Sequence, residues 1–204
     1  FSCNYLANIP EMLDLAKETR RRSPNATIVV GGHSVSFIPE TVLQQSDGAI
    51  DCVLTGEGEA SIPLVLARAA EGTRAASLHE IPGAVTPNGH GPAAAFVADL
   101  NALRPARHLL GHRRKYFLGP MDPCASIELS RGCPWDCAFC SAWTFYGRSY
   151  RLRSAEHVLD DLASILEPGV FIVDDVAFIH AEHCMAIGEG IARRGIRKRD
   201  YLET

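Results

Sequence analysis

A short run of cysteines is the part of this sequence best suited to chemistry. Cys133, Cys137 and Cys140 are spaced C-x3-C-x2-C directly after the strand-like run 125–129. The glycine and proline on either side of Cys133 favour a tight loop, in which backbone N–H groups can point toward sulfur atoms. Cys137 and Cys140 are three residues apart, so a single helical turn brings their thiolates together. Three thiolates so placed can ligate three irons of a [4Fe–4S] cluster and leave the fourth iron open.

Two other chemistries fit the same spacing. One is a zinc site with a distant fourth ligand, and the other is a redox pair formed by Cys137 and Cys140. Aromatic residues around the loop favour the iron–sulfur cluster, because an apolar shell limits the access of solvent and oxygen and tunes the reduction potential. These aromatic residues are Trp135, Phe139, Trp143 and Phe145. The other cysteines are scattered and are expected to be small buried residues: Cys3, Cys52, Cys124 and Cys184.

The composition is that of an ordinary globular protein, with 47% hydrophobic and 22% charged residues. A net charge of -4 argues against a nucleic-acid partner, and the basic runs 20–22 and 112–115 are expected to be solvated faces. No apolar run is long enough to span a bilayer, and the first residues lack a signal-peptide pattern, so we expect a cytoplasmic protein. The absence of an initiating Met suggests a piece of a longer chain.

The first 75 residues alternate between helical and strand-like patterns, which predicts βαβ units. Glycines follow the two predicted strands, so a ligand is expected against Gly31-Gly32 and the run 56–59. Ser61 stands at the third glycine position of a dinucleotide fingerprint, and no lysine completes a phosphate loop. The alternative is that these glycines only permit tight turns. The predicted helices are 10–22, 39–45 and 60–70, and the predicted strands are 26–30 and 50–54.

The second half predicts a β-α-β-α-β order after a Pro-rich connector. We expect three segments, with domains at 1–75 and 124–204 and a connector at 76–123. A small hairpin within the connector is predicted to pair 83–85 with 96–97. The later elements are predicted as strands at 125–129, 170–173 and 200–204, and as helices at 154–166 and 180–194.

With these elements in place, the cysteine loop resembles the defining motif of radical S-adenosylmethionine (SAM) enzymes. The residues carrying this resemblance are the three cysteines and the aromatic Phe139 just before Cys140. The lead-in 130–132, Ser-Arg-Gly, is similar to that of the subgroup with an N-terminal cobalamin-binding domain, and the order of residues 28–59 agrees. The run 140–151 further resembles methylases of this subgroup that act on a polycyclic lipid.

The resemblance implies an α/β fold: a partial Rossmann-like (flavodoxin-like) cobalamin-binding domain followed by the first half of a radical SAM (β/α) partial barrel. It implies that Cys133, Cys137 and Cys140 hold a [4Fe–4S] cluster whose open iron chelates S-adenosylmethionine. A radical from SAM would then activate a carbon atom, and methylcobalamin would deliver the methyl group. The other cofactor-binding residues implied are Gly31, Gly32, Gly56, Glu57, Gly58, Glu59, Phe139, Asp174 and Asp175.

Partners and alternatives follow from the same resemblance. The family uses a small-molecule or lipid substrate and an electron donor such as a flavodoxin or ferredoxin, and a lipid substrate leaves room for peripheral membrane contact. Asp174 and Asp175 could instead be helix caps or solvated charges, Glu203 is a weaker candidate, and His33 is not expected to ligate cobalt. The alternative functions are another cobalamin-dependent radical SAM reaction in natural-product biosynthesis, or a non-enzymatic corrinoid or metal-binding module. By itself this stretch is expected to be inactive.

Overall fold

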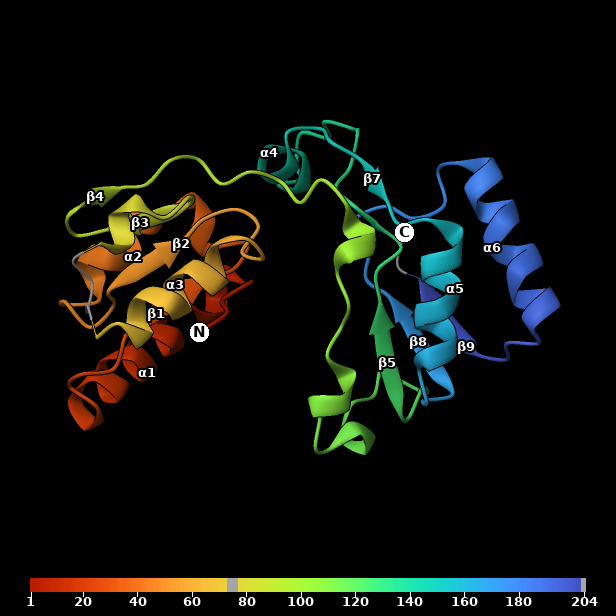
Figure 1. Ribbon diagram of the computed structural model, residues 1–204, viewed down its shortest axis with the longest axis horizontal. Helices are drawn as coiled ribbons and strands as arrows, with labels where there is room; N and C mark the ends of the chain where they lie inside the picture. Colours follow the sequence, from red (N-terminus) through yellow and green to blue (C-terminus); the bar gives the residue numbers. More distant parts are fainter. Residues whose placement is uncertain (73–76, 203–204) are drawn as a thin grey trace. The chain divides into compact units, whose positions relative to one another are not determined.

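Two sheets built around parallel strands, one in each half of the chain, carry the fold (Figure 1). The computed structural model describes residues 1–72 and 77–202. The chain divides into two units, Phe1–Val97 and Ala98–Thr204, each with its own sheet and core. The predicted α/β class is therefore confirmed. The division falls inside the stretch 76–123, where a connector is expected.

The sheet of the first unit has the strand order β1-β2-β3-β4. β1 and β2 are parallel, with Val30 opposite Val53, and both side chains are completely buried. These β-branched residues suit a strand covered on both faces. Beside β1, Ser2 forms a parallel bridge with Gly31. The strands are β1 (Val29–Gly31), β2 (Cys52–Leu54), β3 (Ala84–Thr86) and β4 (Gly89–His90).

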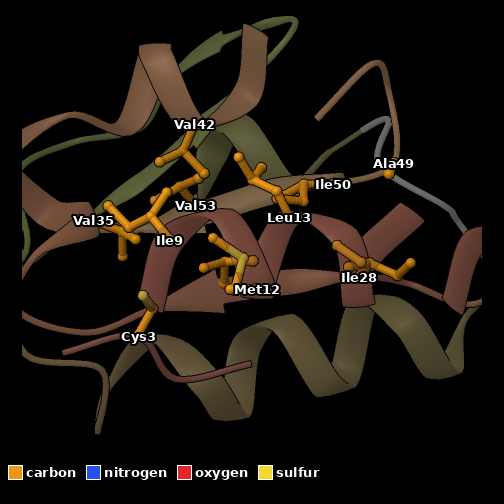
Figure 2. Close-up of a cluster of buried hydrophobic side chains, with 12 residues drawn as sticks. Cys3, Ile9, Met12, Leu13, Ile28, Val35, Val42, Ala49, Ile50 and Val53 are labelled. Carbon is orange, nitrogen blue, oxygen red and sulfur yellow. The ribbon is translucent and has the colours of Figure 1, made fainter. Parts of the chain in front are cut away.

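Helices cover both faces of this sheet. α1 (Ile9–Arg22) and α2 (Pro39–Gln45) pack on one face, where α1 buries residues at the helical spacing 9, 12, 13 and 16. Figure 2 shows Ile9, Met12 and Leu13 gathered with Ile28 and Val53 in one core. α3 (Ser61–Ala70) packs on the other face through Val65. The 3-10 turns of this unit are η1 (Leu6–Asn8), η2 (Val35–Phe37) and η3 (Leu78–Glu80).

Two expectations for this unit were wrong. Arg20 is not part of a solvated run, because its guanidinium lies 2.6 Å from the buried carboxylate of Asp51, which also accepts a bond from the Ile28 N–H. The hairpin is also different. β3 pairs with β4 across a tight turn and not with residues 96–97, because the Pro-Asn-Gly run after Thr86 permits a short reversal.

The sheet of the second unit has three parallel strands in the order β5-β8-β9, which confirms the predicted β-α-β-α-β order. α5 and α6 cover one face, and their apolar residues pack against Ile127, Val170 and Ile172. A two-stranded antiparallel pair, β6 and β7, extends from β5. The elements are β5 (Cys124–Ile127), β6 (Ser130–Arg131), α4 (Ala142–Tyr146), β7 (Arg151–Leu152), α5 (Ala155–Ser164), β8 (Gly169–Ile172), α6 (Ala181–Arg194) and β9 (Arg199–Leu202).

Residues 98–123 are built into the second unit and run beside β5 (Figure 1). The Arg107 guanidinium donates to the Ser126 carbonyl at 2.7 Å, and the Cys124 N–H donates to the Tyr116 carbonyl at 2.8 Å. This stretch contains the 3-10 turns η4 (Leu100–Ala102), η5 (Arg107–Leu109) and η6 (Arg113–Lys115). No helix in the described ranges is long and apolar enough to cross a membrane.

Candidate functional site

The cysteine loop starts from the β6–β7 pair, which forms its stem. Ser130 pairs with Leu152 and Arg131 with Arg151, so the chain leaves and re-enters the loop at one place. Gly132 has a φ of +90°, and a Cβ atom there would lie 2.3 Å from the Ser149 carbonyl oxygen. Any other residue would clash with backbone as well as adopt a strained conformation. Glycine is thus required where the loop begins.

The three cysteines of the loop are accessible thiols. Cys137 is exposed, Cys133 and Cys140 are half-buried, and the Cys140 N–H donates to the Cys137 carbonyl at 3.0 Å, so these two residues lie on one turn. Within residues 1–72 and 77–202, no three His, Cys, Asp or Glu side chains are grouped to hold a single metal ion. A [4Fe–4S] cluster does not require the three side chains to meet at one metal ion, because each thiolate binds a different iron. Three accessible thiols on one short loop fit it.

The aromatic residues do not close around these thiols. The Phe139 side chain is 93% exposed and Trp135 is 51% exposed. Trp143 is turned toward the loop, where its indole N–H donates to the Cys137 carbonyl at 3.1 Å, and the Arg148 guanidinium lies 5.6 Å from its ring centre. The expected apolar shell is therefore not formed by Phe139 and Trp135, whose side chains remain largely exposed.

Asp174 and Asp175, which follow β8, hold the stem of the loop. The Asp174 carboxyl accepts from the Leu129 N–H at 2.8 Å and from the Ser130 hydroxyl, and the Asp175 carboxyl accepts from the Gly132 N–H at 3.2 Å. The two carboxyls therefore lie at the carboxyl end of β8, as expected, but their hydrogen bonds fix the backbone that leads to Cys133. Glu203 lies outside the described residues.

Burial raises the pKa of Asp174 to about 6. Hydrogen bonds from Ser130 and Leu129 oppose the rise, and the charge of Glu128 adds to it. The folded chain therefore keeps a proton between about pH 4 and 6 that the unfolded chain loses, so this group makes the fold less stable as the pH rises through that interval. An Asp174→Asn variant should be more stable than the parent at pH 7.5 by roughly 1–2 kcal/mol, allowing for solvent screening, but not at pH 4.

Urea unfolding at the two pH values would measure this difference. Asparagine can keep both hydrogen bonds, because its oxygen can accept from Leu129 while its NH2 donates to Ser130, whose hydroxyl lies 3.1 Å from the Val176 carbonyl. The exposed Glu189→Gln on α6 is a matched control that should change stability by less than about 0.5 kcal/mol. A loss of stability in Asp174→Asn at pH 7.5 would show that the ionised carboxylate is needed.

The glycines of the first unit lie at the carboxyl ends of β1 and β2, and the structure brings the two loops together. The Gly56 N–H lies 3.3 Å from the Ser36 hydroxyl oxygen. Gly32 has a φ of +120°, and a Cβ atom there would lie 2.6 Å from the Cys3 carbonyl oxygen. The N-terminal strand-like segment thus crosses Gly31-Gly32 closely, which by itself accounts for a glycine at position 32. The backbone N–H of the neighbouring His33 donates to Asn4 at 3.1 Å.

Glu57 has a partner within the chain that its sequence position did not suggest. Its side chain is buried and accepts from the Val97 N–H at 2.6 Å. Ala94, in the same segment as Val97, packs closely on Gly56, where an added Cβ atom would lie 3.3 Å from the Ala94 Cβ atom. Residues 92–97 therefore lie over the second glycine loop. Gly58 lies in the turn before α3, where its carbonyl accepts from the Ile62 N–H at 2.8 Å, and Glu59 is exposed.

A buried ionic network near the site was missed by sequence reasoning. Asp161 on α5 is 9% exposed and pairs with both Arg107 and Arg153, and Arg153 also donates to the Glu128 carbonyl at 3.0 Å. Burial opposes ionisation of Asp161, but hydrogen bonds from the two arginines hold its pKa below the usual value. The sequence did contain a signal for this network, because Asp161 is a charged residue on the apolar face of the predicted helix 154–166.

Comparison with known proteins bears on this arrangement. Residues 1–66 match the B12 binding domain family. The whole chain is 59% identical over 204 residues to the hopanoid C-3 methylase of Methylococcus capsulatus, of which it covers 39%. The resemblance to cobalamin-dependent radical SAM enzymes is confirmed. The chain spans about two fifths of this relative.

Solved structures of cobalamin-dependent radical SAM enzymes share the fold. OxsB, with aqua-cobalamin and S-adenosylmethionine bound, superposes with a TM-score of 0.73 at 24% identity, over 98% of this chain and 29% of that one. The radical SAM methyltransferase TsrM from Kitasatospora setae superposes with a TM-score of 0.68 at 21% identity, over 92% of this chain and 36% of that one. These similarities show that the fold of both units is that of the cobalamin-dependent radical SAM enzymes.

Proposed function

We propose that the parent of this chain is a radical SAM C-methyltransferase that uses a [4Fe–4S] cluster, S-adenosylmethionine and cobalamin to methylate C-3 of a hopanoid. The observation that carries the proposal is the 59% identity to a hopanoid C-3 methylase, which extends over both units. The chain spans only part of that relative, so the activity is assigned to the full-length enzyme. The isolated chain is expected to be inactive.

In this proposal Cys133, Cys137 and Cys140 hold the cluster. Their accessibility and their place on one short loop support the assignment, as does the paired β6–β7 stem from which the loop starts. When bound, the cofactors supply radical cleavage of SAM and delivery of a methyl group. The chain itself positions the loop: Asp174 and Asp175 hold its entry through Leu129, Ser130 and Gly132. Exposed Phe139 is available to cover a bound cofactor.

Cobalamin is assigned to the carboxyl ends of β1 and β2, at Gly31-Gly32 and the loop 56–59. Ligands of open parallel sheets bind at this edge, and residues 1–66 match the B12 binding domain family. Gly31, Gly32, Gly56 and Gly58 are the proposed backbone contacts of the ligand, in addition to the packing of Gly32 against Cys3 and of Gly56 against Ala94, while Glu57 fixes the segment beside them. We further assign a flavodoxin or ferredoxin as electron donor, a cytoplasmic location and no nucleic-acid partner.

Label transfer in the full-length enzyme tests this proposal. After anaerobic iron–sulfur reconstitution and addition of cobalamin and reductant, a methyl-labelled SAM should label C-3 of a hopanoid that lacks this methyl group. Label in another product, or a ring-closed product without label, would contradict the methylase proposal and would indicate another radical SAM reaction. A colourless protein that binds zinc and cleaves no SAM would replace it by a structural metal-binding module.

A further inference from the structure

Residues 104–118, called here the basic segment, have a charge opposite to that of the whole chain. The chain has a net charge of -4, yet the basic segment contains only basic charged residues. Large apolar side chains are exposed among them, up to 75% for Leu109 and 68% for Phe117. Exposed apolar residues gathered in one place usually mark a binding surface. The others are Leu110, Tyr116 and Leu118.

Two arginines hold the basic segment in place. Arg107 pairs with the buried Asp161, and Arg113 makes a two-pronged ion pair with the buried Glu167, at 2.6 and 2.7 Å. Asp161 lies on α5 and Glu167 lies just after the end of this helix. The segment is therefore fixed at two of its residues, Arg107 and Arg113. The apolar side chains between and after these points are exposed on a backbone that is already ordered. Binding through them costs less conformational entropy than ordering a free loop would.

The remaining positive charge of η6 has no ion-pair partner in the part of the chain that the structure describes. Arg114 and Lys115 are both exposed, and neither forms an ion pair within the described ranges. A second stretch adds to the same surface: Leu166 is 78% exposed and lines a hollow together with Arg114. Cations beside exposed leucines and aromatic rings complement a surface that is anionic outside and apolar just beneath.

We propose that the basic segment docks on an anionic lipid bilayer. Arg114 and Lys115 would meet the headgroups while Leu109, Phe117 and Leu166 enter the boundary between headgroups and acyl chains. A nucleic acid would match the charge but not the apolar side chains. The end of the segment that carries Arg114, Lys115 and Phe117 adjoins the amino end of β5, where the Cys124 N–H donates to the Tyr116 carbonyl, whereas the cysteine loop follows the carboxyl end of this strand (Figure 1). The surface is therefore an anchor outside the cofactor site, and it is independent of the proposed reaction.

Vesicle flotation tests this proposal in the full-length enzyme and in this chain. Both should bind phosphatidylcholine vesicles containing a quarter phosphatidylglycerol, should bind pure phosphatidylcholine far less, and should be released by 0.5 M salt, as expected from screening. The double variant Arg114→Ala, Lys115→Ala should reduce partitioning roughly 30-fold. The double variant Leu109→Ser, Phe117→Ser should reduce it about tenfold. All four residues are exposed, so the thermal midpoint should not change.

Leu66→Ser on α3, another exposed leucine, is the matched control and should leave binding unchanged. Equal loss in this control, or no preference for the anionic vesicles, would overturn the proposal. Binding by this chain but not by the full-length enzyme would show that the rest of the protein covers the surface, which also overturns it. A dimer in the absence of vesicles, abolished by the same variants, would identify a contact between copies and would equally contradict a lipid partner.

Discussion

Replacing any one of Cys133, Cys137 and Cys140 by serine is expected to remove most of the bound iron after anaerobic reconstitution. A serine hydroxyl is a poor substitute for a thiolate ligand, and the loop provides only three ligands, so none can be spared. Iron content and the broad visible absorbance should each fall about tenfold or more, while far-UV circular dichroism should persist because the loop is largely exposed.

Cys184→Ser is the control, because Cys184 is half-buried on α6 and outside the loop. An equal loss of iron in this variant would show that the loop cysteines are not the specific ligands. The same series separates the alternatives left open by the spacing. A zinc site gives a colourless protein with one metal ion per chain, whereas a redox pair depends on Cys137 and Cys140 but not on Cys133.

The second large effect concerns folding. Asp161→Ala should destabilise the second unit by about 3–5 kcal/mol, because it leaves the guanidinium groups of Arg107 and Arg153 without their shared carboxylate. Both tryptophans of the chain lie in this unit, so their fluorescence during urea unfolding reports on it. Because the pKa of Asp161 is lowered in the folded state, its stabilising contribution is complete above the unfolded pKa and is lost as the pH falls through the folded one.

Asp160→Ala tests whether burial is the cause. Asp160 lies beside Asp161 on α5 and pairs with Arg194 at 2.7 Å, but its side chain is 57% exposed. Such pairs contribute about 0–1 kcal/mol, so this variant should change stability little. An equally small effect of Asp161→Ala would contradict the prediction, because it would mean that water reaches the network and solvates the two arginines once the carboxylate is removed.

Local patterns were sufficient to predict much of the fold. Pro10 and the apolar residues at 12, 15 and 16 predicted α1, although Leu15 is 50% exposed, and Ser154, whose hydroxyl accepts from the His157 N–H, predicted the start of α5. The cysteine loop could be identified because its three cysteines are near in sequence. The partners of Glu57 and Asp161 could not, since their bonds span 40 and 54 residues and depend on how strands and helices have already packed. The hairpin partner of β3 was wrong because a short turn was available nearer in the chain.

The hydrogen bond between Glu57 and Val97 also has a mechanical consequence. Val97 is tied to the first unit, and two residues later the Asp99 side chain accepts from the Asn101 N–H at 2.9 Å and begins η4 of the second unit. Asn101 in turn accepts from the Ser154 N–H at 2.8 Å, at the start of α5. The joint between the units is thus reduced to the backbone around Ala98. The passage of the chain from one unit to the next is therefore a few backbone dihedral angles long, and not a long flexible linker.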